Sequence, residues 1–147
     1  MTPMTFFERF YSRSSQETIH IGGRLVQTLL SHSSLICLRG ELGTGKTTLI
    51  KGMVATLTGT DPHEVVSPTF TYLQTYSGQQ TVHHFDLYRL KDKRAFVHKG
   101  FLDYLHSHCP VLIEWPEKIF SLLGSSPVTI DLLYQPEENH RTIVVKQ

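Results

Sequence analysis

One eight-residue segment restricts the fold of this 147-residue chain more than any other. Residues 40–47 read Gly-Glu-Leu-Gly-Thr-Gly-Lys-Thr, after an apolar run at 35–38 and before a helix-like stretch at 48–57. This is the P-loop pattern G-x-x-x-x-G-K-[ST] in its strand–loop–helix context. Its glycines allow positive φ, so that successive N–H groups can point at phosphate oxygens, and the following helix directs its positive end at the same place. The segment therefore predicts a binding site for a nucleoside phosphate.

Side chains of this loop have expected roles. Lys46 supplies a mobile charge for the β- and γ-phosphates, which makes it a candidate catalytic residue, and the Thr47 hydroxyl is the expected magnesium ligand. The loop residues expected to contact the nucleotide are Glu41, Leu42, Gly43, Thr44, Gly45, Lys46, Thr47 and Thr48.

The remaining pattern predicts an α/β fold in one domain over residues 1–147. A capping-box spacing begins a helix at 15–30, where apolar residues recur every four positions. Residues 111–114 are apolar up to a final acid, as in a buried parallel strand. Alternating side chains at 70–76, followed by a turn, predict an antiparallel hairpin with strands at 70–76 and 81–86. Such a hairpin would make the sheet mixed. Weaker signals predict strands at 5–11, 128–133 and 141–146 and a helix at 95–106.

Composition excludes some classes of function. Lysine and arginine total 14 against 13 acids, so the net charge of +1 does not indicate nucleic-acid or membrane binding. No stretch reaches the roughly 18 apolar residues of a membrane span, and the first eleven residues lack a signal-peptide core. We therefore expect a soluble cytoplasmic protein with no membrane partner.

Two predicted strands end in acids that could complete a P-loop site. Glu114 follows the buried strand and is the predicted magnesium ligand, with a helix cap or a salt bridge as the alternative. Asp86 ends the hairpin and is assigned to water activation or to the second metal shell, unless it pairs with Arg89.

Two further residues are candidates for the site. Thr69, in Ser67-Pro68-Thr69, could be a switch-type residue whose hydroxyl meets magnesium or the γ-phosphate, or part of an ordinary turn. Trp115 directly follows Glu114, so it either contacts the base or packs in the core.

The nucleotide and the reaction follow partly by elimination. The guanine-selective Asn-Lys-x-Asp motif is impossible, because the single asparagine is Asn139. ATP is therefore the expected nucleotide. Transfer of its phosphoryl group to water is the leading reaction, because a kinase would need a lid and an arginine-rich insertion, and the only arginines after Asp86 are Arg89, Arg94 and Arg141. A small-molecule kinase and a non-catalytic nucleotide-sensing scaffold remain alternatives.

Four stretches together resemble one known family. They are the P-loop at 40–48, Ser-Pro-Thr-Phe-Thr at 67–71, His-Phe-Asp-Leu-Tyr-Arg-Leu at 84–90 and Ile-Glu-Trp-Pro-Glu at 113–117. In order and spacing they resemble the TsaE (formerly YjeE) family, the bacterial ATPases of tRNA threonylcarbamoyladenosine synthesis, over about residues 14–134.

This resemblance implies a P-loop NTPase-like three-layer fold, with a parallel core and antiparallel flanking strands, and an ATPase that depends on Mg²⁺. It implies Thr47 and Glu114 at the metal and Asp86 in hydrolysis, with Ser15 and Thr18 on the adenine side. The implied partners are TsaD and TsaB homologues, which modify position 37 of ANN-decoding tRNAs, so that tRNA is reached indirectly.

One segment departs from the family pattern. Residues 91–94 read Lys-Asp-Lys-Arg, where the family usually has an acidic helix start. A solvated loop is favoured over an RNA contact for this basic run. The reversed charge makes any partner contact implied there doubtful, but leaves the nucleotide site unchanged.

Overall fold

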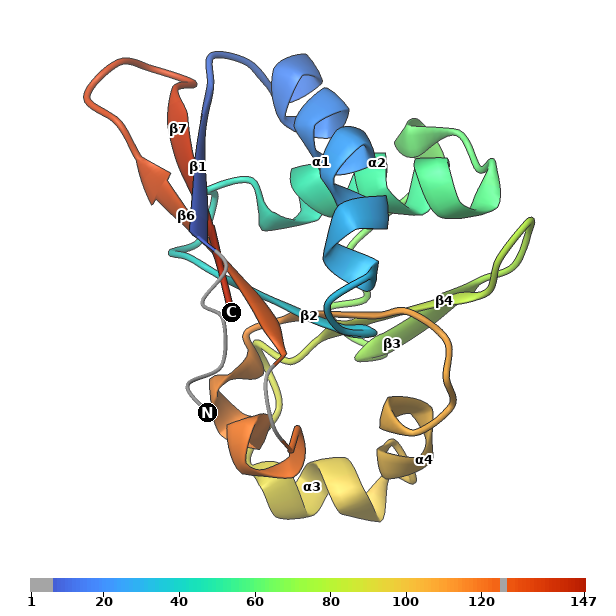
Figure 1. The fold of residues 1–147 in the computed structure, drawn as a ribbon. Helices are drawn as coiled ribbons and strands as arrows, with labels where there is room; N and C mark the ends of the chain where they lie inside the picture. The colour runs from blue at the N-terminus through green and yellow to red at the C-terminus, as the bar shows by residue number, and fades with distance from the viewer. Residues whose placement is uncertain (1–6, 125–126) are drawn as a thin grey trace, which may run out of the picture.

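The computed structural model describes residues 7–124 and 127–147, which form a seven-stranded sheet with helices on both faces (Figure 1). The strands are β1 (Phe7–Ser12), β2 (Leu35–Arg39), β3 (Leu73–Tyr76), β4 (Val82–Asp86), β5 (Val111–Glu114), β6 (Val128–Tyr134) and β7 (Arg141–Lys146). The helices are α1 (Ser15–Leu30), α2 (Lys46–Thr58), α3 (Lys93–His98) and α4 (Leu102–Leu105), with 3₁₀ segments at Pro62–Glu64 and Pro116–Leu122.

The sheet has the order β1-β7-β6-β2-β5-β4-β3. Strand β2 is parallel to both of its neighbours, β5 and β6, and β4 is parallel to β5. Strands β1, β3 and β7 pair antiparallel. The predicted mixed sheet, with a parallel core and antiparallel flanking strands, is therefore confirmed.

The register of the parallel strands fixes where a site can lie. Glu114, at the end of β5, has Leu38 of β2 and Asp86 of β4 as its Cα partners. The carboxyl ends of these strands therefore meet at one edge of the sheet, the usual place for ligands in open α/β sheets.

The helices divide the structure into three layers. Helices α1 and α2 cover one face, where Leu29 and Met53 pack with Ile36 and other fully buried side chains of the sheet. Helices α3 and α4 and the segment Pro116–Leu122 lie against the opposite face, around Phe85 and Phe96 (Figure 1). Each face therefore has its own apolar core.

Glycine allows α1 and α2 to touch along their backbones. A Cβ atom added at Gly52 of α2 would lie 1.8 Å from the carbonyl oxygen of Ile19, and one added at Gly22 of α1 would lie 2.2 Å from that of Leu49. Real Cβ atoms do not approach so closely, so larger residues here would force the helices apart. This contact holds the start of α1 beside the P-loop.

Most predicted elements are present, and α1 spans residues 15–30 as expected. Its N-terminus is capped as predicted, because the Ser14 hydroxyl accepts the Glu17 N–H at 3.0 Å. Strand β1 is described from Phe7 to Ser12, and the first part of the predicted strand, Thr5 and Phe6, lies outside the described residues. No helix of the described chain is long and apolar enough to cross a membrane.

Two predicted boundaries were wrong. The expected helix at 95–106 is two short helices, because Gly100 takes a left-handed φ of +79° that ends α3. The strand expected from residue 70 begins only at Leu73. Tyr72 has a φ of +68° and donates its N–H to the Pro68 carbonyl at 2.7 Å, so a turn precedes β3.

Candidate functional site

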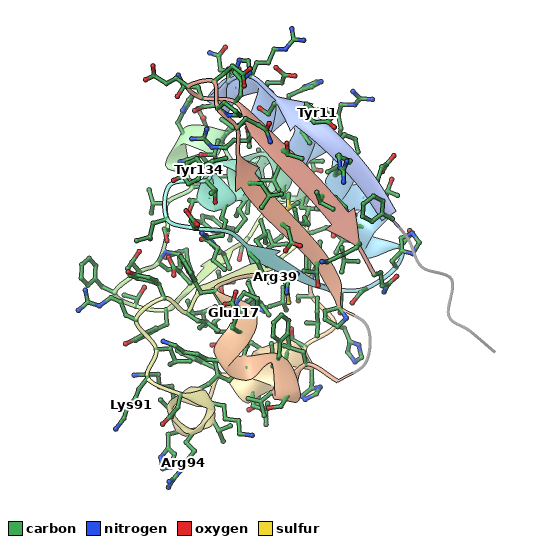
Figure 2. The ribbon with its side chains drawn as sticks, turned by 90° about the vertical axis from the view of Figure 1, so that its left-hand side faces the viewer. Tyr11, Arg39, Lys91, Arg94, Glu117 and Tyr134 are labelled. Atoms are coloured by element: carbon green, nitrogen blue, oxygen red, sulfur yellow. The ribbon has the colours of Figure 1, made fainter. Side chains whose placement is uncertain are left out.

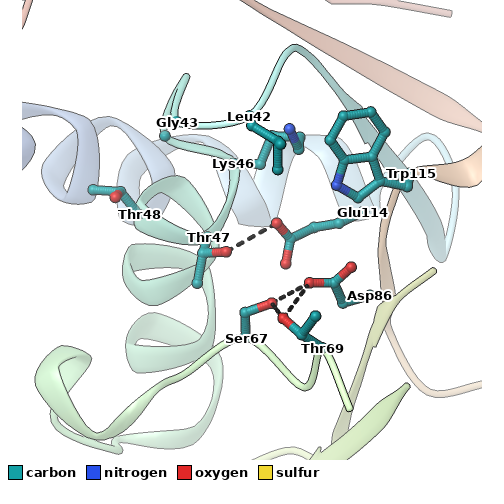
Figure 3. A pocket seen from close by; sticks show the side chains of 11 residues that line it. Leu42, Gly43, Lys46, Thr47, Thr48, Ser67, Thr69, Asp86, Glu114 and Trp115 are labelled. Carbon is teal, nitrogen blue, oxygen red and sulfur yellow. Dashed lines mark hydrogen bonds between the residues drawn. The ribbon is translucent and has the colours of Figure 1, made fainter. Parts of the chain in front are cut away.

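A pocket of about 280 Å³ opens where the P-loop meets the ends of β4 and β5 (Figure 3). Its walls come from the start of α2, the loop before β3 and the acids that end β4 and β5. The lining residues are Leu42, Gly43, Gly45, Lys46, Thr47, Thr48, Ser67, Thr69, Asp86, Glu114 and Trp115. The fold thus gathers most of the predicted site residues into one cavity.

The P-loop backbone is shaped for an anion. Gly43 and Gly45 have φ values of +81° and +101°, in the region that other residues rarely adopt. Helix α2 begins directly after Gly45, and no side chain caps it. Because the first N–H groups of a helix have no partner within it, the start of α2 offers donors and a positive dipole end to a phosphate.

Lys46 is 5 % exposed and folds back over the loop. Its ammonium donates to the carbonyl of Gly40 at 2.5 Å and to that of Glu41 at 3.0 Å, and lies 4.1 Å from the centroid of the Trp115 ring. Burial lowers the pKa of Lys46, and the nearby Glu114 and Asp86 oppose this shift. The lysine is therefore held beside the phosphate pocket by two backbone carbonyls and the Trp115 ring.

Thr47 and Glu114 meet directly. The Thr47 hydroxyl donates to Glu114 Oε1 at 2.9 Å (Figure 3), and Glu114 Oε2 lies 2.7 Å from His84 Nε2. Glu114 is 3 % exposed. One carboxylate oxygen thus faces the start of α2, and the other is held from within the sheet.

Asp86 is surrounded by hydrogen-bond donors. Its Oδ2 accepts hydrogen bonds from the hydroxyls of Ser67 and, at 3.2 Å, Thr69 (Figure 3). Its Oδ1 accepts the Tyr88 N–H at 3.1 Å. Ser67 was not a predicted site residue. Its only sequence signal was its place in the stretch 67–71, because the partner acid is 19 positions away.

Arg89, the alternative partner of Asp86, lies elsewhere. Its guanidinium is 4.9 Å from the ring centroid of Phe70, which is 78 % exposed, and no ion pair joins Arg89 to Asp86 in the described structure. The described partners of the Asp86 carboxylate are therefore the Ser67 and Thr69 hydroxyls and the Tyr88 N–H.

Trp115 takes part in both the pocket and the packing. It has a left-handed φ of +57° and lines the pocket, and its ring centroid lies 4.9 Å from that of Tyr88. It also packs against the second core. In the pocket, the ring faces Lys46 at the phosphate end.

A smaller, polar pocket of about 70 Å³ lies on the other side of the P-loop. It holds both residues expected at the adenine side, and its lining residues are Ser14, Ser15, Thr18, Gly43, Thr44, Gly45, Thr48, Asn139 and Arg141. Arg141 was not predicted here. Its guanidinium donates to the carbonyls of Thr44 at 3.2 Å and Gly43 at 3.3 Å, a contact that only the return of β7 creates.

Two predicted groups lie outside these pockets. The exposed Glu41 contributes its carbonyl, which accepts from Lys46 and Thr44, but its side chain lines neither pocket. In the basic run, Lys91 and Arg94 are exposed and project away from the sheet (Figure 2).

The P-loop, the parallel strands beside it and the two acids at their ends define a P-loop NTPase-like protein. The family model described as "Threonylcarbamoyl adenosine biosynthesis protein TsaE" matches residues 12–143, so this chain belongs to the TsaE family. The resemblance seen in the sequence is thereby confirmed.

Individual proteins agree with this membership. A tRNA threonylcarbamoyladenosine biosynthesis protein TsaE from Treponema pallidum is 36 % identical over 92 % of this chain and 98 % of its own length. The protein of the same name from Aquifex aeolicus is 34 % identical over 78 % of this chain and 81 % of its own length. The crystal structure of YdiB from Bacillus subtilis superposes with a TM-score of 0.70 at 23 % identity, covering 99 % of this chain and 88 % of that one. This last likeness shows the fold.

Proposed function

We propose that this chain is a magnesium-dependent ATPase that assists the synthesis of threonylcarbamoyladenosine at position 37 of ANN-decoding tRNAs. Family membership supports the biosynthetic role. The observation that carries the ATPase proposal is the convergence of Lys46, Thr47, Glu114 and Asp86 on one pocket at the P-loop. TsaD and TsaB homologues are the proposed partners, through which the chain reaches tRNA indirectly.

The residues present fit a magnesium ion. Mg²⁺ prefers oxygen ligands and is commonly held by one or two protein groups together with water and substrate phosphates. Thr47 Oγ1 and Glu114 Oε1 supply two such oxygens 2.9 Å apart. Within residues 7–124 and 127–147 no cluster of three or more His, Cys, Asp or Glu could hold a metal, and this kind of site needs none. When bound, the ion neutralises charge on the β- and γ-phosphates.

The chain's own groups then have distinct tasks. The start of α2 and Lys46 bind the phosphates, after the Lys46 ammonium exchanges its two loop carbonyls for phosphate oxygens. Ser15 and Thr18 border the small pocket proposed for the adenine side. Asp86 orients the attacking water and accepts its proton, while the Tyr88 N–H keeps the carboxylate in place.

One observation favours the non-catalytic alternative. None of the residues that line the larger pocket in the described chain is an arginine. P-loop enzymes that turn over quickly use a positioned arginine to stabilise the transition state of phosphoryl transfer. A nucleotide-sensing scaffold would bind Mg-ATP in the same pocket without hydrolysing it, so binding and turnover must be measured separately.

The test compares the wild type with Lys46→Ala and with Lys91→Ala, which removes an exposed lysine that lines neither pocket. Calorimetry should detect Mg-ATP binding by the wild type and Lys91→Ala, and none by Lys46→Ala. A single-turnover assay should then release free phosphate slowly. Wild-type ATP affinity in Lys46→Ala would refute the P-loop site. Binding without phosphate release would support the nucleotide-sensing scaffold. Phosphate on an added acceptor would indicate a small-molecule kinase.

A further inference from the structure

A histidine beneath the site has no role in the function proposed so far. His84 lies on β4 two residues before Asp86 and is fully buried. Its Nε2 is 2.7 Å from Glu114 Oε2, the carboxylate oxygen that faces away from Thr47. The two oxygens of Glu114 therefore have different partners, one in the interior and one at the pocket.

The surroundings of the ring indicate which nitrogen carries the proton. Nδ1 of His84 is buried and has no hydrogen-bond partner among the described residues, and Nε2 faces a carboxylate oxygen, which accepts. A proton on Nε2 is used in this bond, whereas a proton on Nδ1 would be a buried donor without an acceptor, which is costly. The ring is thus arranged to donate through Nε2.

We propose that His84 is a positioning residue that fixes the Glu114 carboxylate for magnesium. A glutamate has three side-chain torsions, and a single contact to Thr47 leaves the carboxylate free to turn. The second hydrogen bond, from the interior, holds Oε2 and thereby directs Oε1 at the Thr47 hydroxyl. Such outer partners of metal ligands commonly change metal affinity by about 10- to 100-fold when removed. This inference rests on the proposed magnesium site.

The neighbouring histidine provides a matched control. His83 is on the same strand and 7 % exposed, but it serves another contact: its Nδ1 lies 2.8 Å from Thr75 Oγ1, and its ring packs 4.8 Å from that of Tyr104. Changing His83 perturbs the same strand without touching Glu114.

The test uses two amides that differ by one methylene. In His84→Gln the amide nitrogen reaches about as far as Nε2, whereas in His84→Asn it stops near the position of Nδ1. Binding of the β,γ-imido analogue of ATP is measured by calorimetry, once with Mg²⁺ and once with EDTA, alongside His83→Gln. We expect His84→Asn to lose about tenfold in affinity with Mg²⁺ and less than twofold in EDTA. His84→Gln and His83→Gln should remain within about threefold of the wild type in both conditions.

Each outcome has a distinct meaning. Equal losses with and without Mg²⁺ in His84→Asn, or no loss, would overturn the positioning role, provided that Glu114→Gln shows a magnesium-dependent loss. If Glu114→Gln also shows none, the proposed magnesium site itself fails. A second measurement needs no variant: ¹⁵N spectra of histidine-labelled wild type should show the His84 proton on Nε2. A proton on Nδ1 alone would overturn the proposal, even if the variants do not fold.

Discussion

The Lys46 ammonium lies 4.1 Å from the centroid of the Trp115 ring, so the P-loop cation rests against an indole at the pocket wall. A cation near an aromatic ring is attracted by about 0.5–2 kcal/mol, depending on how far it is desolvated. Phosphate oxygens would compete for this same ammonium. The contact therefore links the position of Lys46 to the surroundings of the chain's single tryptophan.

The first prediction is that Trp115 reports nucleotide binding. Addition of Mg-ATP or Mg-ADP should change its emission, because Lys46 leaves the ring and phosphate charge arrives nearby. The measurement is a fluorescence titration, in which Lys46→Ala should give no change up to the same nucleotide concentration. An unchanged spectrum at saturating nucleotide, with binding verified by calorimetry, would contradict this coupling.

The second prediction separates the two acids by role. Glu114→Gln should weaken nucleotide binding by about tenfold with Mg²⁺ present and little without it, because a metal-ligand oxygen is replaced by a poorer donor. Asp86→Asn should keep ATP affinity within a few-fold and lose at least about tenfold in turnover, since it can no longer accept a proton. Calorimetry and single-turnover phosphate release distinguish them. Reversed phenotypes would show that the roles of Glu114 and Asp86 were assigned the wrong way round.

The third prediction concerns an ion pair that joins β2, β6 and β7. Asp131 contacts Arg39 at 2.7 Å and Lys146 at 2.9 Å. Burial raises the pKa of Asp131, but the hydrogen bonds and charges of the two cations outweigh it, so the net shift is downward. A carboxyl whose pKa is lower in the folded state stabilises the fold above its unfolded pKa of about 3.9, and this contribution is lost as pH falls through the folded pKa.

Asp131→Asn should therefore lower the free energy of unfolding by about 1 kcal/mol at pH 7, and the difference from wild type should shrink below pH ~4. Urea unfolding of the variant and the wild type, once at pH 7 and once below pH ~4, measures this difference in stability. The exposed Glu138→Gln should change little at either pH. A difference that grows in acid would mean that the pair does not depress the carboxyl pKa.

Local sequence patterns were sufficient to predict those elements that depend on a single hydrophobic repeat or a single motif. Helix α1 follows from its capping residues and its four-residue apolar repeat, and β5 from four consecutive buried positions that end in Glu114. The P-loop motif places Lys46 and Thr47 by itself. These features depend on neighbours in the chain, so they can be read without the fold.

Contacts between distant segments could not be predicted in this way. Ser67 meets Asp86, His84 meets Glu114 and Arg141 meets the P-loop only because the sheet order brings these distant segments together. The break at Gly100 could not be predicted either, because a glycine tolerates both the helical and the left-handed backbone conformation.

The fourth prediction tests the close contact of α1 and α2. Gly52→Ala places a Cβ where the Ile19 carbonyl oxygen is now 1.8 Å away, so the helices must separate. Overpacking of this kind costs about 1–3 kcal/mol, more than alanine's better helix propensity returns. Urea unfolding should show this loss. Gly59→Ala is the control. A Cβ atom added there has nothing within 4 Å, so this variant is strained only by its φ of +85° and measures backbone strain without a clash.

The last prediction is that the isolated chain hydrolyses ATP slowly and that its partners accelerate it. A positioned arginine raises P-loop turnover by roughly 10³ to 10⁵, supplied in cis or by a partner. Here Arg39 is paired with Asp131, Arg89 stacks on Phe70 and Arg141 holds the outer side of the P-loop. No arginine of the described chain lines the larger pocket, so we expect a partner to supply the cation or to reorder the loop that carries Ser67 and Thr69. Phosphate release should be measured for the chain alone, then with TsaD and TsaB homologues, and then with tRNA. We expect at least about a tenfold increase on adding the two proteins, and Lys46→Ala should abolish it. Fast turnover by the chain alone, with no response to the partners, would contradict this prediction.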